Sequence, residues 1–178
     1  MVLNGRSADK VERIRAFLRS SPSRSGQLKL QQVVQDAESL LRQEMMYQRV
    51  EFNVVLPPAD VPVVAEALPL TQALVQVLRN AMQAVHDRTL RTITVTLSAQ
   101  GSEAHIEVQD SGGGFSRHML SRISGGDLPL VEERGGLGLY MTQEILRQFK
   151  GQLVLDNTPS GGAVVRLILP LAAKSPEL

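Results

Sequence analysis

Apolar residues recur at intervals of three and four in several stretches of the chain, as they do in helices that bury one face. The clearest stretch is 68–86, where Pro69 suits a first helical turn and leucine, alanine and valine supply the apolar positions. The same spacing predicts helices at 7–20, 30–48, 116–123 and 138–150, the last of them ended by Gly151.

Elsewhere apolar and polar residues alternate, which predicts strands with one buried face. Gly101 marks a turn between two of these strands, and the loop at 158–162 makes the final pair a hairpin. Most strand neighbours are then antiparallel, with helices between them. We therefore expect an α/β (α+β) two-layer sandwich, with a mixed, mostly antiparallel sheet and helices on one face. The predicted strands are 50–56, 91–98, 103–109, 152–156 and 163–169.

The domain organisation follows from a change in composition near the start of the chain. Residues 20–26 read Ser-Ser-Pro-Ser-Arg-Ser-Gly, which is typical of a linker. We expect a segment at 1–24, one domain at 25–172 and a tail at 173–178. A length of 178 residues suits a single domain with a substantial core.

Composition and charge exclude several classes of function. Nineteen basic residues face eighteen acidic ones, and a net charge of +1 gives no electrostatic reason to expect a nucleic-acid partner. The chain has no cysteine, so disulfides, thiolate zinc sites and a cysteine nucleophile are excluded. Its three histidines lack the spacing of a metal site. No apolar run reaches the roughly 20 residues of a membrane span, so no membrane contact is expected.

The polar side of the predicted helix at 68–86 carries an unusual stripe. Its members are spaced by four, four and three residues and are all neutral amides, whereas a solvated helix face usually carries Lys and Glu. Amides bind a hard cation or a phosphate oxygen without adding charge. An ordinary glutamine-rich surface would give the same pattern. The stripe consists of Gln72, Gln76, Asn80 and Gln83.

Two glycine-rich segments are candidates for binding a ligand. Asp110-Ser-Gly-Gly-Gly114 follows a strand directly, which favours either a close approach of ligand to backbone or a flexible turn. Gly135-Gly-Leu-Gly-Leu139 opens a helix, where amide groups attract anions, although glycines also begin helices without any ligand. No Gly-Lys-Ser or Gly-Lys-Thr is present, so the chain has no P-loop.

Taken together and in this order, these segments resemble the superfamily named for gyrase, heat-shock chaperones, histidine kinases and MutL. Gln76–Ala84 resembles its asparagine box, Asp110–Gly114 its first glycine box and Gly136–Leu139 its second. Gly161-Gly-Ala163 resembles the closing glycine element, and the resemblance covers about 28–170. It implies a Bergerat-type ATP-binding fold. Within the superfamily, the match is best to histidine kinases related to nitrogen-regulation and dicarboxylate sensors, on the segment Arg-Asn-Ala-Met-Gln-Ala that follows Val-Leu.

The resemblance implies a role for each matched residue. Asn80 would hold Mg²⁺ on the ATP phosphates, and Asp110 would accept a hydrogen bond from the adenine amine. Gly112 and Gly114 would let the nucleotide lie against the backbone, and 116–134 would form a lid that lacks the phenylalanine box usual in such kinases. The phosphate end would be lined by Gly136, Leu137, Gly138 and Leu139. From its position just before them, and not from the resemblance, we expect Arg134 to offset phosphate charge, and Gln83 of the amide stripe is a further cofactor-binding candidate.

Asn80 and Gln76 are the candidate catalytic residues. Gln76 stands where hydrolysing relatives have glutamate, and a glutamine is no general base for water. This departure favours a kinase, or an inactive binding protein, over a gyrase-like ATPase.

The resemblance finally implies a catalytic domain that transfers the γ-phosphate of ATP to a histidine outside this chain. Ile14–Arg19 resembles the end of a dimerisation domain, so 1–24 would be its remnant, and no phosphoacceptor box follows. We expect a cytoplasmic monomer that does not phosphorylate itself, from a homodimeric parent, with or without a membrane anchor, that serves a response regulator. An anti-sigma-factor-type serine kinase and a pseudokinase docking module remain alternatives.

Overall fold

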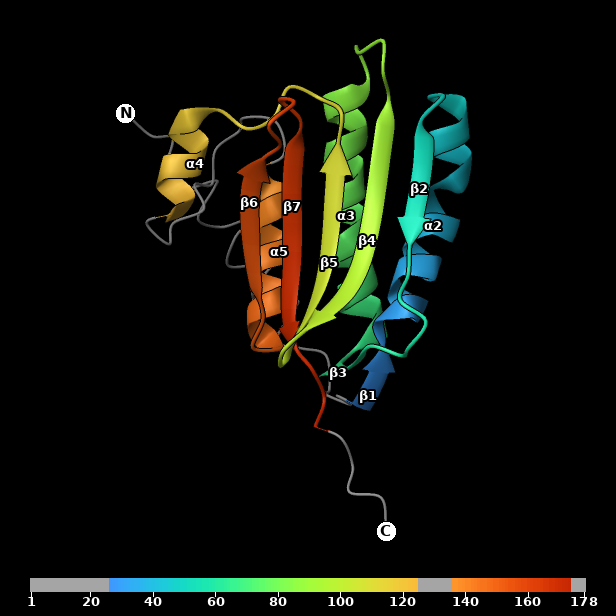
Figure 1. Ribbon diagram of the computed structural model, residues 1–178, viewed down its shortest axis with the longest axis vertical. Helices are drawn as coiled ribbons and strands as arrows, with labels where there is room; N and C mark the ends of the chain where they lie inside the picture. Colours follow the sequence, from blue (N-terminus) through green and yellow to red (C-terminus); the bar gives the residue numbers. More distant parts are fainter. Residues whose placement is uncertain (1–25, 125–135, 174–178) are drawn as a thin grey trace, which may run out of the picture.

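The computed structural model describes residues 26–124 and 136–173, so the predicted helix at 7–20, the segment 1–24 and Arg134 lie outside the described residues. A five-stranded sheet in the order β2-β4-β5-β7-β6 forms one layer (Figure 1). Only β2 and β4 run parallel, whereas the other three pairs are antiparallel. The predicted fold class is confirmed. The strands are β2 (Glu51–Val55), β4 (Thr92–Gln100), β5 (Glu103–Asp110), β6 (Gln152–Asn157) and β7 (Ala163–Pro170).

The second layer consists of helices on one face of this sheet (Figure 1). They are α2 (Leu30–Tyr47), α3 (Ala67–Val85) and α5 (Gly136–Gln148), while the short α4 (Arg117–Ser124) lies beside the sheet at one end. All four helices were predicted, but α5 begins two residues before the expected position 138. The glycines of the second glycine box therefore lie inside its first turn.

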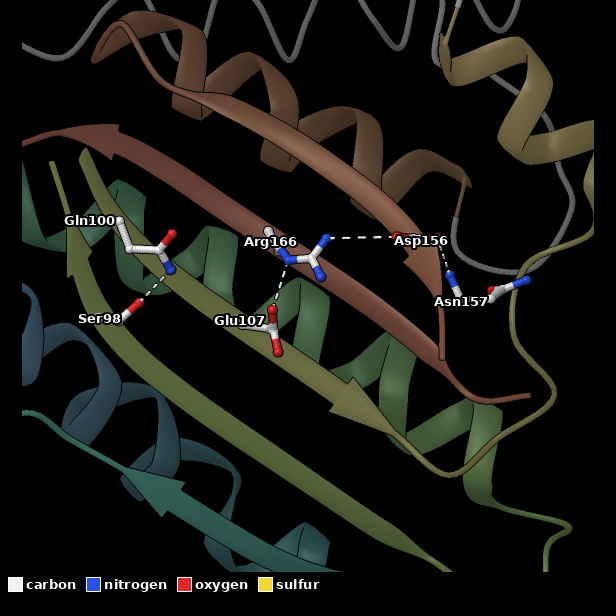
Figure 2. Close-up of polar contacts among 6 residues, drawn as sticks. All are labelled: Ser98, Gln100, Glu107, Asp156, Asn157 and Arg166. Atoms are coloured by element: carbon white, nitrogen blue, oxygen red, sulfur yellow. Dashed lines mark hydrogen bonds and ion pairs between the residues drawn. The ribbon is translucent and has the colours of Figure 1, made fainter. Parts of the chain in front are cut away.

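The alternation of residues along the strands decides which face the helices cover. On β4, Ile93, Val95 and Leu97 are buried under the helices, and the threonines between them point to the other face. That other face is polar. Figure 2 shows Arg166 of β7 between Glu107 and Asp156, at 2.7 and 3.9 Å. The core is thus a single aliphatic layer between sheet and helices.

A small second sheet was not predicted. Its strands, β1 (Gly26–Lys29) and β3 (Pro62–Ala65), pair antiparallel and have only four residues each, too few to show a clear alternation. Val63 also forms a bridge with Leu171, just beyond β7. The start and the end of the described chain therefore meet on β3, at the pole of the molecule opposite to the carboxyl end of β5 (Figure 1).

The packing of α3 against α5 includes one buried hydroxyl group. Thr142 of α5 is completely buried, and its Oγ1 lies 3.2 Å from the carbonyl oxygen of Ala73 and 2.9 Å from that of Gly138. A hydroxyl has only one hydrogen, so it donates to these two acceptors in turn. The contact links the helix of the amide stripe to the helix of the second glycine box.

We expect Thr142→Val to lower the free energy of unfolding by about 1 kcal/mol, because valine keeps the shape but loses the hydrogen bond. Urea denaturation would measure this change. Thr94→Val, on the polar face of β4, is the matched control and should leave stability nearly unchanged. Equal effects of the two substitutions would contradict a role for the hydroxyl.

Candidate functional site

A pocket of about 340 Å³ lies at the pole of the molecule where α3 and β5 end. Its wall comes from the last turns of α3, the end of β5, the loop after it, the start of α4 and the first residue of β7. Four of the predicted residues, Asn80, Gln83, Asp110 and Gly114, line it. The full lining is Asn80, Gln83, Ala84, Arg88, Asp110, Gly113, Gly114, Phe115, Ser116, Met119 and Ala163.

Asp110, the last residue of β5, is the acidic group of this pocket. Its side chain is buried, and its Oδ1 accepts hydrogen bonds from the backbone N–H of Gly112 at 2.8 Å and of Ala163 at 3.3 Å. Burial raises the pKa of this carboxyl above its ordinary value, although the two N–H groups and the charge of Arg88 oppose the rise.

Oδ2 of Asp110 accepts no hydrogen bond from any residue that the structure describes. Because both backbone donors use Oδ1, the second oxygen is available to a ligand. An ionised carboxylate only accepts hydrogen bonds, so the complementary ligand group is a donor such as an exocyclic amine.

The glycines of the first glycine box are required by the protein itself as well as by any ligand. A Cβ on Gly112 would lie 2.7 Å from the carbonyl oxygen of Ala84, because the loop packs directly on α3. Gly114 has a φ of +73°, and a Cβ there would lie 2.7 Å from Oδ1 of Asn157. Of the two, only Gly114 lines the pocket.

Asn157 at the end of β6 holds this loop in place. Its Oδ1 accepts from the N–H of Phe115 at 2.7 Å, and its Nδ2 donates to the carbonyl oxygen of the same residue at 2.9 Å. The side chain stands at the edge of the polar contacts drawn in Figure 2. Asn157 could not be singled out from the sequence, because an asparagine before a turn is common.

The amide stripe on α3 divides into two parts. Asn80, which is half-buried, and Gln83, which is exposed, line the pocket. Gln76 instead faces α5, because a Cβ added to Gly138 of that helix would lie 3.1 Å from Oε1 of Gln76. Gln72 is exposed and lies one turn before Gln76, toward the start of α3. The stripe therefore leads from the pocket toward the start of α5.

The second glycine box does not line the pocket in the described part of the chain. Leu139 is completely buried, so its side chain belongs to the core and only its backbone is available to a ligand. Leu137 is exposed and Gly138 is half-buried. Gly136 is the first residue of α5. Of the predicted lid at 116–134, Ser116 and Met119 line the pocket, whereas 125–134, with Arg134, lies outside the described residues.

Several pocket residues were not predicted. Arg88 follows α3 in a loop, and charged residues in loops give no specific signal. Phe115 and Met119 are partly buried and pack on the core, so they supply an apolar wall. An apolar wall with a few convergent polar groups is typical of a small-molecule site.

Two kinds of feature are absent from the described residues. These residues contain no group of three or more His, Cys, Asp or Glu side chains placed to hold a metal ion. In the same residues, no helix combines the length and the apolar character needed to cross a membrane.

Comparisons with known proteins agree with the geometry. Residues 65–173 match the family described as histidine kinase-, DNA gyrase B- and HSP90-like ATPases. The sensor protein FixL of Bradyrhizobium diazoefficiens is 26% identical over 168 residues, which are 94% of this chain and 33% of that protein. The C4-dicarboxylate transport sensor protein DctB of Pseudomonas aeruginosa is 29% identical over 170 residues, or 94% of this chain and 28% of that protein.

The fold comparison gives the same result. The catalytic domain of histidine kinase ThkA has a TM-score of 0.72 at 18% identity, covering 84% of this chain and 97% of that domain. This likeness shows that the two share a fold. The chain spans only about a third or less of the length of the two sensor proteins. The resemblance drawn from the sequence motifs is confirmed.

Proposed function

Because the chain belongs to the family of histidine kinase-, DNA gyrase B- and HSP90-like ATPases, we propose that it binds ATP as the catalytic domain of a sensor histidine kinase. One observation carries the proposal. The family's asparagine and first glycine box meet in a single pocket, with Asn80 on one wall and the free oxygen of Asp110 on another. The relatives named above are sensor proteins, which does not favour the serine-kinase alternative.

In this proposal the adenine lies at the Asp110 end of the pocket. Oδ2 of Asp110 accepts a hydrogen bond from the purine amino group, and Phe115 and Met119 supply the apolar wall. A volume of about 340 Å³ lies at the lower end of the range found for ligand sites, so it fits a base with its ribose better than a whole nucleotide. The phosphates then extend along the amide stripe toward α5.

Asn80 fits a magnesium site that the nucleotide completes. Mg²⁺ usually takes one or two protein ligands together with phosphate oxygens and waters, so no cage of carboxylates is needed. The amide oxygen of Asn80 is of the right type and lines the pocket. When bound, the ion would offset the negative charge of the phosphates. Asn80 positions it, and the amide stripe adds no charge of its own.

The phosphoryl acceptor in this proposal is a histidine and not water. Gln76 lies beside α5, along the path that we assign to the phosphates, and its amide removes no proton from water. The acceptor would belong to a dimerisation domain of the parent protein, which passes the phosphoryl group to a response regulator. We also propose that this chain alone is a monomer that acts in the cytoplasm, where ATP is available.

Calorimetric titration of the chain with ATP, with and without Mg²⁺ and with GTP as control, tests the binding step. We expect adenine-selective binding that Mg²⁺ strengthens, and no binding by the folded chain would reject the proposal. The transfer step needs a separately purified dimerisation domain and ATP labelled at the γ-phosphate. Acid-labile label on that domain would indicate phosphohistidine, whereas acid-stable label would indicate a serine kinase.

We expect Asn80→Ala to remove the gain in ATP affinity that Mg²⁺ provides, at least about tenfold, while adenine binding remains. The reason is that alanine has no oxygen for the metal, whereas Asp110 is untouched. ATP titrations at several Mg²⁺ concentrations measure the effect. Asn53→Ala, at an exposed position on β2, is the matched control. An unchanged Mg²⁺ dependence in Asn80→Ala would show that Asn80 is no metal ligand.

A further inference from the structure

Arg88 places an unused cationic group at the pocket. It is the third residue after the end of α3 and lines the pocket with Asp110. Its guanidinium makes no hydrogen bond or ion pair with any residue in the described ranges. The neighbouring Arg91 contrasts with it, because its Nη1 and Nε donate to the carbonyl oxygens of Gln48 and Arg88 at 2.9 and 3.0 Å. Arg91 therefore fixes the loop, whereas the guanidinium of Arg88 has no partner among the residues that the structure describes.

Arg88 and Asp110 influence each other across the pocket without touching. The positive charge of Arg88 is near enough to lower the pKa of the Asp110 carboxyl in part, yet no ion pair joins the two described side chains. A donor-only group and an acceptor-only group thus face the same space. A ligand that fits between them presents an acceptor next to a donor.

The edges of adenine have this pattern. The amino group is a donor, and each ring nitrogen beside it, N1 on one edge and N7 on the other, is an acceptor. We propose that Arg88 donates a hydrogen bond to the adenine ring nitrogen that lies beside the amino group bound by Asp110. This proposal rests on the ATP-binding function proposed above and adds a second specificity-determining residue to it.

Gly113 makes room for this arrangement. A Cβ at position 113 would lie only 2.5 Å from Nη2 of Arg88, so the guanidinium lies directly over the glycine backbone. Gly113 has no positive φ, and its only close neighbour is the end of a flexible side chain. Gly113→Ala is therefore expected to fold normally and to push the guanidinium away from the base.

The test compares ATP with 1-deaza-ATP and 7-deaza-ATP, in which a C–H group replaces N1 or N7. We expect Arg88→Ala to weaken ATP binding by about ten- to a hundred-fold, as for the loss of a charge-assisted hydrogen bond. For one of the two deaza nucleotides, the wild type and Arg88→Ala should bind with nearly equal, weak affinity. That analogue identifies the contacted nitrogen. Gly113→Ala should show the same pattern in weaker form.

Arg79→Ala is the matched control, because it removes an exposed arginine of α3 that lies outside the pocket lining and should leave all three affinities unchanged. If Arg88→Ala lowered the affinities for all three nucleotides by one common factor, general charge attraction or stacking would explain the effect and the proposal would be wrong. Binding of ATP by the wild type reports on the proposed function separately. If the wild type bound no ATP, both proposals would fall together.

Discussion

Replacing Asp110 with asparagine is expected to reverse the base preference of the pocket from ATP to inosine triphosphate. Oδ1 of Asp110 already accepts hydrogen bonds from the N–H groups of Gly112 and Ala163. An asparagine keeps its oxygen toward these donors and turns its NH₂ group into the pocket. That group opposes the amino group of adenine but donates to the carbonyl oxygen of hypoxanthine.

The expected loss for ATP is about 3 kcal/mol, or more than a hundredfold in affinity, because a charged hydrogen bond is replaced by two donors that face each other. Calorimetry with ATP and inosine triphosphate measures both sides of the reversal. Asp36→Asn on α2, outside the pocket lining, removes the same charge and should change neither affinity. If Asp110→Asn bound ATP as the wild type does, Asp110 would not contact the base.

The same substitution should not weaken the nucleotide-free fold. Burial raises the pKa of Asp110 above the ordinary value of 3.8. The folded protein therefore keeps the proton of this carboxyl at a pH where the unfolded chain has lost it. The free energy of unfolding therefore falls as the pH rises through that interval, and the loss persists at neutral pH. Asparagine carries no charge to desolvate. Thermal unfolding at neutral pH should find Asp110→Asn at least as stable as the wild type.

Gly162→Ala is expected to have the largest effect on stability. The added Cβ would overlap the backbone carbonyl oxygen of Asp110, in the adjacent strand of the sheet. Asp110 is the last residue of β5 and Gly162 directly precedes β7, so neither backbone moves aside as a flexible side chain would. We expect a loss of at least about 3 kcal/mol in the free energy of unfolding, since overpacking against backbone forces the strands apart.

The distortion should also reach the pocket, because Ala163 next to it donates to Asp110 and lines the site. Chemical denaturation and ATP titration of Gly162→Ala measure the two effects. Gly26→Ala is the matched control, because a Cβ there meets nothing within 4 Å. A free energy of unfolding for Gly162→Ala equal to that of the control would show that the backbone at this contact yields easily.

The elements with many residues could be predicted because each shows its spacing several times. Helix α3 has nine buried residues at helical intervals, whereas the four residues of β1 or β3 give no pattern to recognise. Those short strands form because they pair with each other although they lie far apart in the sequence, and local sequence patterns carry no information on such pairing. The start of α5 was missed by two residues, because glycine is a poor sign of a first helical turn.

The site could be predicted where a residue type was unusual for its place. Asp110 is a carboxylate at the end of a buried strand, and Asn80 belongs to a stripe without charges, so both drew attention and both line the pocket. Arg88 was missed because a charged residue after a helix is ordinary, and only the fold brings it opposite Asp110. The glycines of the first glycine box predicted either a close approach of a ligand or a turn, and Gly112 and Gly114 are needed where the protein packs on itself.

The small sheet of β1 and β3 has a consequence for engineering. Ala172 donates to the carbonyl oxygen of Pro62 at 2.8 Å, and Gly26 lies on the strand paired with β3, so both ends of the described domain leave from one pole. A short glycine linker could therefore join residue 172 to residue 26 without crossing the pocket. New termini could be opened at the exposed turn of Gly101. This turn precedes β5 and lies at the opposite end of that strand from Asp110. The new termini would then lie at the same pole as the joined ends, because Leu171 donates to the carbonyl oxygen of Ser102 at 2.9 Å, so a reporter protein could be attached there while the pocket at the other pole stays whole.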